Sequence, residues 1–333
     1  MNGRLAEASR LVSEYMVLIE SIGDPKLTVR LALVPIAVKI STGELAEALR
    51  WSQMVIDLAE GDRAGGGYIL GSPLASAYAL RCTARWPLGR AGWREDFNRA
   101  VAMARDADPI SQAVVNTYTY NNAIAGGVIV ADDAALRDID EAVQSAQRAA
   151  DDVALGFALY AKANALLHRD SAQRERGLDS LRQVREMAVD GRFYALQVPA
   201  IDAHIAEEMI RRGDRGAVPL LRASVDELCR GGMLGWWLWA TGALVEALLE
   251  SGTDGDVAEA EAAVERLSTQ PVLDGWAWRD LILLRLNALL ARTRGDEAGY
   301  RDFADRYRAL ATSLGFEGHI AIAEAMPTSP PER

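Results

Sequence analysis

Three histidines, His168, His204 and His319, are the only side chains in this 333-residue chain with an ordinary pKa near neutral pH. His204 and Glu208 are four residues apart, so on a helix they share one face and would offer two metal ligands. The spacing suggests no third ligand nearby. The sequence therefore predicts no metal site.

The two cysteines, Cys82 and Cys229, stand alone and form no C-x-x-C pair for zinc or redox chemistry. Neither has a histidine close in sequence that would activate a thiolate. A G-x-S-x-G nucleophile motif is absent, and no lysine follows a glycine as a phosphate-binding loop requires. We expect a protein that is not an enzyme, has no catalytic residues and needs no cofactor.

A series of polar residues interrupts the apolar segments about once every 40 residues. Its members are Arg81, Asn122, Asn164, His204, Glu246 and Asn287. Equal spacing in a repeat protein predicts one ridge, and on a concave face this polar series would bind an extended peptide or a polar small molecule. The alternative is an internal network in which buried polar groups satisfy one another.

Aromatic residues accompany this polar series. Tyr78, Tyr118 and Tyr160 each lie three or four residues before a member, hence on the same helical face. Tryptophans open two later segments, with Trp236, Trp237 and Trp239 in one and Trp276 and Trp278 in the next. They serve either to pack neighbouring repeats or to form a surface for an apolar or peptide ligand, and we expect Trp239 and Trp276 to flank the groove.

The elements that carry these residues repeat along the chain. The segment 3–8 (GRLAEA) returns at 43–48 (GELAEA), about 40 residues later, as in stacked helical pairs. Second helices of each pair are predicted to open near seven positions: Glu44, Trp93, Asp132, Arg176, Asp214, Asp256 and Asp296. The first helices, such as 74–85, 113–130, 153–167 and 281–291, are apolar all round and therefore predicted to lie between neighbours.

This periodicity predicts an all-α fold, a right-handed superhelical solenoid of about seven helix-turn-helix repeats spanning residues 27–314. We expect one domain over residues 1–326 and a flexible tail at 327–333. The amphipathic helix 5–22 resembles a second helix without its partner, so the domain begins in mid-repeat and exposes an apolar face suited to homo-oligomer formation. The glycine run at 65–67 is expected in a long loop.

Composition narrows the class of partner. The formal net charge is −11, and an acidic surface repels both phosphate backbones and anionic lipids. We therefore expect neither nucleic acid nor membrane as a partner, but a protein, a peptide or a small-molecule effector. Two unpaired cysteines and an N-terminus without signal-peptide features predict a cytoplasmic location.

The repeated glycine, leucine and alanine pattern at 43–48 resembles the tetratricopeptide repeat, although the unit here exceeds the usual length of about 34 residues and indicates a long-helix subtype. Further segments resemble the C-terminal region of large mycobacterial regulators of the LuxR type, which carry a class III adenylate/guanylate cyclase domain and a signal-transduction ATPase ahead of helical repeats. They are 69–75, 92–94, 300–303, 307–309 and 313–319. The resemblance implies a sensor arm whose ATPase or cyclase partner is attached or associated.

Two functions therefore remain open from the sequence. In the first, an effector in the groove regulates an attached or associated ATPase or cyclase of a signalling protein. In the second, the chain is a passive scaffold for protein assembly. The polar series favours the first function and the unpaired N-terminal helix favours the second.

Overall fold

The computed structural model describes residues 4–61 and 72–327. Two features expected from the sequence, the glycine run at 65–67 and all but the first residue of the 327–333 tail, lie outside these residues. Within the described ranges the regular structure is entirely helical, with no strand. The all-α prediction is confirmed.

The part of the chain up to residue 125 contains α1 (Arg4–Ile22), α2 (Pro25–Leu31), α3 (Leu33–Ser41), α4 (Leu45–Gly61), α5 (Pro73–Arg85), α6 (Trp93–Ala104), α7 (Pro109–Asn116) and α8 (Asn122–Ala125). A π-helical turn, Thr117–Asn121, joins α7 to α8. The remainder contains α9 (Asp133–Ala149), α10 (Asp152–Leu167), α11 (Ser171–Val189), α12 (Val198–Arg211), α13 (Val218–Gly231), α14 (Leu234–Ser251), α15 (Asp254–Ser268), α16 (Ala277–Thr293), α17 (Glu297–Leu314) and α18 (Glu317–Ala325).

Aspartates begin several helices. Asp132, Asp151 and Asp170 each accept a hydrogen bond from a backbone amide in the first turn of α9, α10 and α11. Such side chains satisfy amides that have no partner within the helix. Most predicted second-helix starts agree within four residues, but α11 begins at Ser171 rather than near Arg176. Asp170 caps the helix more than a turn earlier than the sequence prediction.

Helices adjacent in sequence pack against one another, as α4 does on α5, α10 on α11 and α16 on α17. Small residues permit this close approach. A Cβ added to Gly177 of α11 would lie 3.0 Å from the carbonyl oxygen of Ala163 in α10. The predicted pairing of neighbouring helices is therefore present.

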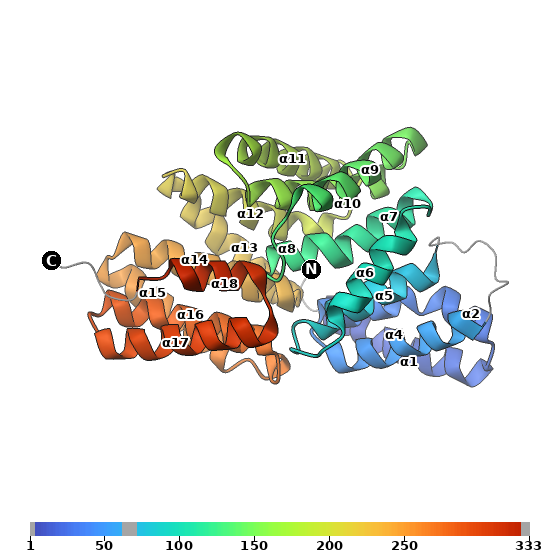
Figure 1. The fold of residues 1–333 in the computed structure, drawn as a ribbon, viewed down its shortest axis with the longest axis horizontal. Helices are drawn as coiled ribbons and strands as arrows, with labels where there is room; N and C mark the ends of the chain where they lie inside the picture. Colours follow the sequence, from blue (N-terminus) through green and yellow to red (C-terminus); the bar gives the residue numbers. More distant parts are fainter. Residues whose placement is uncertain (1–3, 62–71, 328–333) are drawn as a thin grey trace.

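The two ends of this helical array meet. In Figure 1 the chain runs from α1–α5 at the lower right, over α9–α11 at the top, to α14–α18 at the left. The amide of Trp278 donates to the carbonyl of Pro87, and the amides of Glu317 and His319 donate to Val128 and Gly127. Trp86 packs edge-on against Trp278, with ring centroids 4.9 Å apart. The helices thus close around a centre, whereas the sequence predicts an open groove.

The N-terminal helix α1 has one buried and one exposed apolar face. Leu5, Met16 and Ile19 are buried, and Ser9 accepts a hydrogen bond from the buried Lys39 of α3 at 2.8 Å. On the other side Val17 is 67 % exposed and Leu18 59 % exposed. The prediction that α1 packs on the first helices and leaves its outer side open is confirmed.

Among the described residues, no helix combines the length and the apolar composition needed to cross a bilayer. This includes α14, which holds most of the apolar stretch between Gly231 and Leu249.

Candidate functional site

A cavity of about 370 Å³ lies at the centre of the helical array. Residues of α1, α3, α5, the α7–α8 segment, α10, α14 and the start of α16 line it. Its volume falls within the range of roughly 300 to 1,000 Å³ typical of small-molecule sites. Because several first helices of the pairs face inward, the cavity collects side chains that are far apart in sequence.

None of the described residues that line the cavity carries a charge. One wall is aliphatic and comes from α3, with Val34, Ala37 and Val38. Another part of the lining, called here the aromatic wall, is built by Tyr118, Phe157, Tyr160, Trp236, Trp239 and Trp276. Such a lining favours apolar ligands, because an ion placed there would lose its hydration without gaining a counter-charge.

The aromatic wall is a packed assembly. Trp236 stacks on Tyr160 with ring centroids 5.8 Å apart, and Trp239 meets Trp236 edge-on at 6.0 Å. Behind them His204 lies against Trp239 with centroids 3.8 Å apart. Trp236 and Trp239 remain partly exposed although their neighbour Trp237 is buried. These contacts fix the rings while leaving indole surface open to the cavity.

His204 holds this wall without adding charge to it. Its side chain is 3 % exposed, and burial, reinforced by His168 and Arg211, lowers its pKa well below the ordinary value of 6.5. The imidazole is therefore neutral at neutral pH. Burial also raises the pKa of Tyr118 to about 12, with a smaller contribution from Tyr194. Both groups stay uncharged across the physiological range.

The π-helical turn supplies the polar part of the lining. Thr117, Tyr118, Asn121 and Asn122 all line the cavity. The hydroxyl of Thr83 in α5 donates to the carbonyl of Tyr118 within this turn. Insertion of a side chain into the helical ladder stabilises such a turn, and π turns are frequent at functional sites.

Three asparagines connect the turn to α10. Asn164 donates from Nδ2 to Oδ1 of Asn121 at 2.7 Å, and Asn121 donates to Oδ1 of Asn122 at 3.3 Å. Asn164 is 1 % exposed, whereas Asn122 is partly exposed to the cavity. Among the described residues, no hydrogen-bond partner faces Nδ2 of Asn122. The chain of amides therefore ends at Asn122, a lining residue whose Oδ1 is engaged and whose Nδ2 is not, among the described residues.

Several buried polar atoms of lining residues also have no hydrogen-bond partner among the described residues. They are Oγ of Ser76, Nε1 of Trp86, Oη of Tyr160, Oε1 of Gln197 and Nε1 of Trp278. A buried polar atom without a partner is destabilising and calls for an explanation. Each of these atoms is inaccessible to solvent, so they lie within the wall behind the cavity surface and do not by themselves select a ligand.

The structure brings together about half of the residues that the sequence predicts for the groove. Asn122, Tyr118, Tyr160, Trp239 and Trp276 line the cavity. Asn164 and His204 lie behind its wall, which corrects the prediction that both face the concave space. Their side chains point to neighbouring helices because a shift of one position rotates a helical residue by about 100°.

Of the other four predicted groove residues, three form contacts between elements and one bonds within its own helix. Arg81 is bound by Asp96 of α6, with Nη2 2.5 Å from Oδ1. Tyr78 donates to Glu60 at 2.6 Å, and Glu246 pairs with Arg285 of α16. Asn287 donates to the carbonyl of Leu283 in its own helix. At these positions the internal-network interpretation of the polar series is the correct one.

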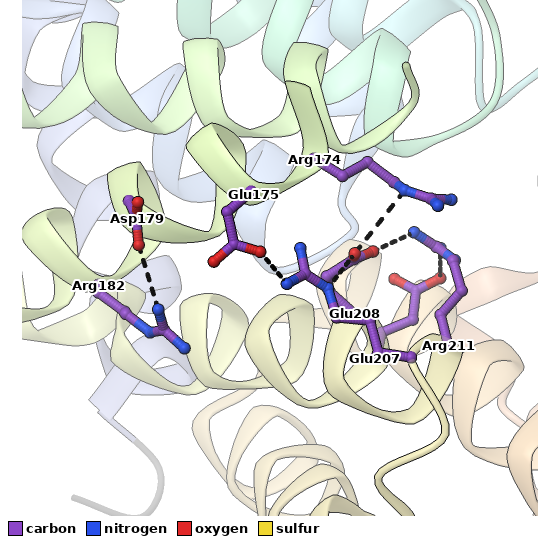
Figure 2. A network of polar contacts seen from close by, with 8 residues as sticks. Arg174, Glu175, Asp179, Arg182, Glu207, Glu208 and Arg211 are labelled. Atoms are coloured by element: carbon purple, nitrogen blue, oxygen red, sulfur yellow. Dashed lines mark hydrogen bonds and ion pairs between the residues drawn. The ribbon is translucent and has the colours of Figure 1, made fainter. Parts of the chain in front are cut away.

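The His204 and Glu208 pair is likewise engaged elsewhere. Glu208 is 1 % exposed and accepts from Arg211 at 2.7 Å and from Arg212 at 2.8 Å, while Arg174 lies 3.8 Å away. Figure 2 shows Arg174 from α11 and Arg211 from α12, each joined to Glu208 by a dashed line. Both carboxylate oxygens are occupied, so this group fastens two helices together. No cluster of three potential metal ligands occurs among the described residues.

Sequence reasoning missed Thr117, Asn121, Ser76 and Gln197 as lining residues. A signal was available for two of them, because the run 117–122 (TYTYNN) is unusually polar for the interior of an apolar helix. Ser76 and Gln197 carried no such signal, since their position depends on how distant helices come together.

The chain matches no known protein-family model, and no curated protein is detectably similar to it in sequence.

Proposed function

We propose that this chain is a non-catalytic regulatory domain of the tetratricopeptide-like solenoid type that binds a small-molecule effector in its central cavity. The observation that carries the proposal is the cavity itself, of about 370 Å³, with an uncharged lining and exposed indole surface. Acid–base catalysis needs a titratable group at the reacting atoms, and the only titratable side chains in the described lining are tyrosines. Binding is the use that this lining supports.

The regulatory role rests on how the cavity is built. Its wall includes Trp86, Gly126 and Trp278, and the same segments hold the two ends of the array together. A ligand that fits the closed arrangement better than an open one shifts the equilibrium toward closure. An ATPase or cyclase module, attached or associated, would sense that shift in a cytoplasmic signalling regulator of the kind that the sequence resembles.

Filling the cavity tests the proposal. Gly235 lines the cavity at the second residue of α14, and a Cβ there meets nothing within 4 Å. Gly255 is the second residue of α15, faces solvent and has the same free space. In a differential scanning fluorimetry screen of neutral apolar compounds, hits should stabilise the wild type and Gly255→Leu but not Gly235→Leu. Hits that stabilise all three proteins equally would reject the cavity as the binding site.

A second function, a passive assembly scaffold, is favoured by the exposed apolar face of α1. Leu11, Val17, Leu18 and Ile22 are each about half exposed or more, and apolar patches of this kind mark protein contacts. Sedimentation velocity over a range of protein concentrations tests this alternative. Concentration-dependent association that Leu18→Glu abolishes would favour the scaffold, whereas a monomer at all concentrations would argue against self-assembly.

A further inference from the structure

We infer that the ligand of the central cavity is an uncharged, rigid aromatic or polycyclic molecule that carries a carbonyl or similar hydrogen-bond acceptor at one end. This inference rests on the proposed function, because it names the chemistry of the ligand for the same cavity. It draws on three separate features of the lining: its charge, its aromatic wall and its polar end.

The first feature is charge. Anionic ligands such as carboxylates and phosphates bind most strongly to arginine and lysine side chains, and no charged side chain is among the described lining residues. His204, which lies against Trp239 of the aromatic wall, is buried and neutral. An anion would be desolvated without compensation. A cation would find aromatic faces but no carboxylate in the described lining.

The second feature is shape. Trp236 and Trp239 expose indole surface, and their edge-on geometry fixes two flat surfaces nearly perpendicular to each other, with an interplanar angle of 87°. Flat rings stack on such surfaces with little loss of conformational entropy. The aliphatic side chains of Val34, Ala37 and Val38 form another part of the lining. A flexible peptide would bring many backbone polar groups into a lining with few partners for them.

The third feature is the polar end. Asn122 lines the cavity and is partly exposed, and its Oδ1 accepts from Asn121, which is itself bound by Asn164. Nδ2 has no partner among the described residues and is therefore the group of this amide left for a ligand. An Nδ2 group only donates, so it selects an acceptor oxygen or nitrogen.

Two fluorescent probes of almost identical skeleton test the charge requirement on the purified full chain. N-phenyl-1-naphthylamine is neutral, and 1-anilinonaphthalene-8-sulfonate adds one sulfonate to it. We expect saturable binding of about one neutral probe per chain, with at least about 10-fold weaker binding of the sulfonate. Gly235→Leu should lower the affinity for the neutral probe by a similar factor, and Gly255→Leu should leave that affinity unchanged. The cationic dye thioflavin T tests the aromatic-cage alternative.

A second pair of compounds tests the polar end by displacement of the neutral probe. 2-Acetylnaphthalene and 2-ethylnaphthalene differ only in the carbonyl oxygen. In Asn122→Leu the affinity of the ketone relative to that of the hydrocarbon should fall by about 5-fold or more. The replacement removes the hydrogen-bond donor and keeps a similar side-chain volume. Circular dichroism and melting confirm that each variant is folded before binding is measured.

The outcomes separate the ligand class from the proposed function. If the sulfonate or thioflavin T binds as tightly as the neutral probe, and Gly235→Leu blocks it, the cavity remains a binding site and the inferred ligand class is wrong. An affinity ratio that Asn122→Leu leaves unchanged would overturn the acceptor requirement. If no probe binds saturably, or Gly235→Leu has no effect, both the inference and the proposed function are rejected.

Discussion

At the scale of single residues, asparagines with similar sequence surroundings take different roles. Asn122 and Asn164 are both polar residues in apolar helices about one repeat apart. The spacing predicts the first helices correctly, yet it places both residues in the groove, and only Asn122 lines it. The π turn causes the difference, because one extra residue in a helical turn rotates the directions of all side chains that follow it. Local sequence does not indicate such a turn.

Asn164→Ala should destabilise the fold by about 1 to 3 kcal/mol, because it strands the buried Oδ1 of Asn121. Asn122→Ala should cost less than about 1 kcal/mol, since Asn122 is partly exposed and its bond to Asn121 is long. Urea unfolding of the two variants measures the difference. Equal losses would mean that Asn122 belongs to the structural network, and the assignment of Asn122 to the ligand would fail.

Buried histidines predict a loss of stability in acid. Burial, reinforced by Arg285, lowers the pKa of His319 to about 3 from 6.5. Nε2 donates to the carbonyl of Gly126 at 3.0 Å, so Nδ1 accepts from the hydroxyl of Tyr307 at 2.8 Å. Below about pH 6.5 the unfolded chain binds a proton that the folded chain does not, so stability falls as pH falls from about 6.5 to about 3.

Between about pH 7 and pH 5 this histidine alone should lower the free energy of unfolding by about 2 kcal/mol. His319→Gln keeps one donor and one acceptor but does not titrate, so its loss over the same interval should be smaller by about that amount. Urea unfolding of both proteins at the two pH values gives the comparison. The same pH dependence in wild type and variant would show that His319 is not held neutral.

At the scale of helices, the sequence is a good guide to pairing and a poor guide to irregularities. Amphipathic stripes and aspartate caps predict α4, α6, α9, α15 and α17 within a few residues, because caps and stripes are local properties. The helix α18 is not predicted, because Gly315 resembles a terminal stop. Its burial depends on Gly127 and Val128, almost 200 residues away in sequence.

Glycines at helix contacts give a second stability prediction. A Cβ on Gly156 of α10 would overlap the ring of Phe193, whereas one on Gly242 of α14 would be 3.7 Å from Ile282. Gly156→Ala should cost about 1 to 3 kcal/mol through overpacking. Gly242→Ala should be neutral or stabilise by up to about 1 kcal/mol, as alanine is the better helix former. Thermal melting that ranks these variants in the opposite order would contradict the packing described for α10.

At the scale of the whole molecule, closure distinguishes this array from an open groove. Arg94 and Glu317 form an ion pair at 3.0 Å across the closing contact, and Phe316 lies between Trp86 and Trp93. Sequence reasoning does not single out this aromatic contact. Closure depends on small rotations accumulated over many helical pairs, which no single segment specifies.

Gly318 permits this closing contact, since a Cβ there would lie 2.9 Å from the carbonyl oxygen of Gly127. Gly318→Val should therefore displace α18 and free the amides of Glu317 and His319, raising their hydrogen exchange by about 10-fold or more. The exposed Gly255→Val, also at the second residue of a helix, is the matched control. Unchanged exchange in Gly318→Val would mean that α18 tolerates the extra volume and does not close the array by this contact.

The central claim is that the closed array binds an apolar small molecule at its centre, and hydrogen–deuterium exchange with and without N-phenyl-1-naphthylamine tests it most directly. The account predicts slower exchange in the cavity-lining segments, α3 (Leu33–Ser41), the π turn (Thr117–Asn121) and the start of α14 (Leu234–Ser251), with α13 and α15 unchanged. Slower exchange confined to α1, or no slowing at a probe concentration that saturates binding, would contradict this claim.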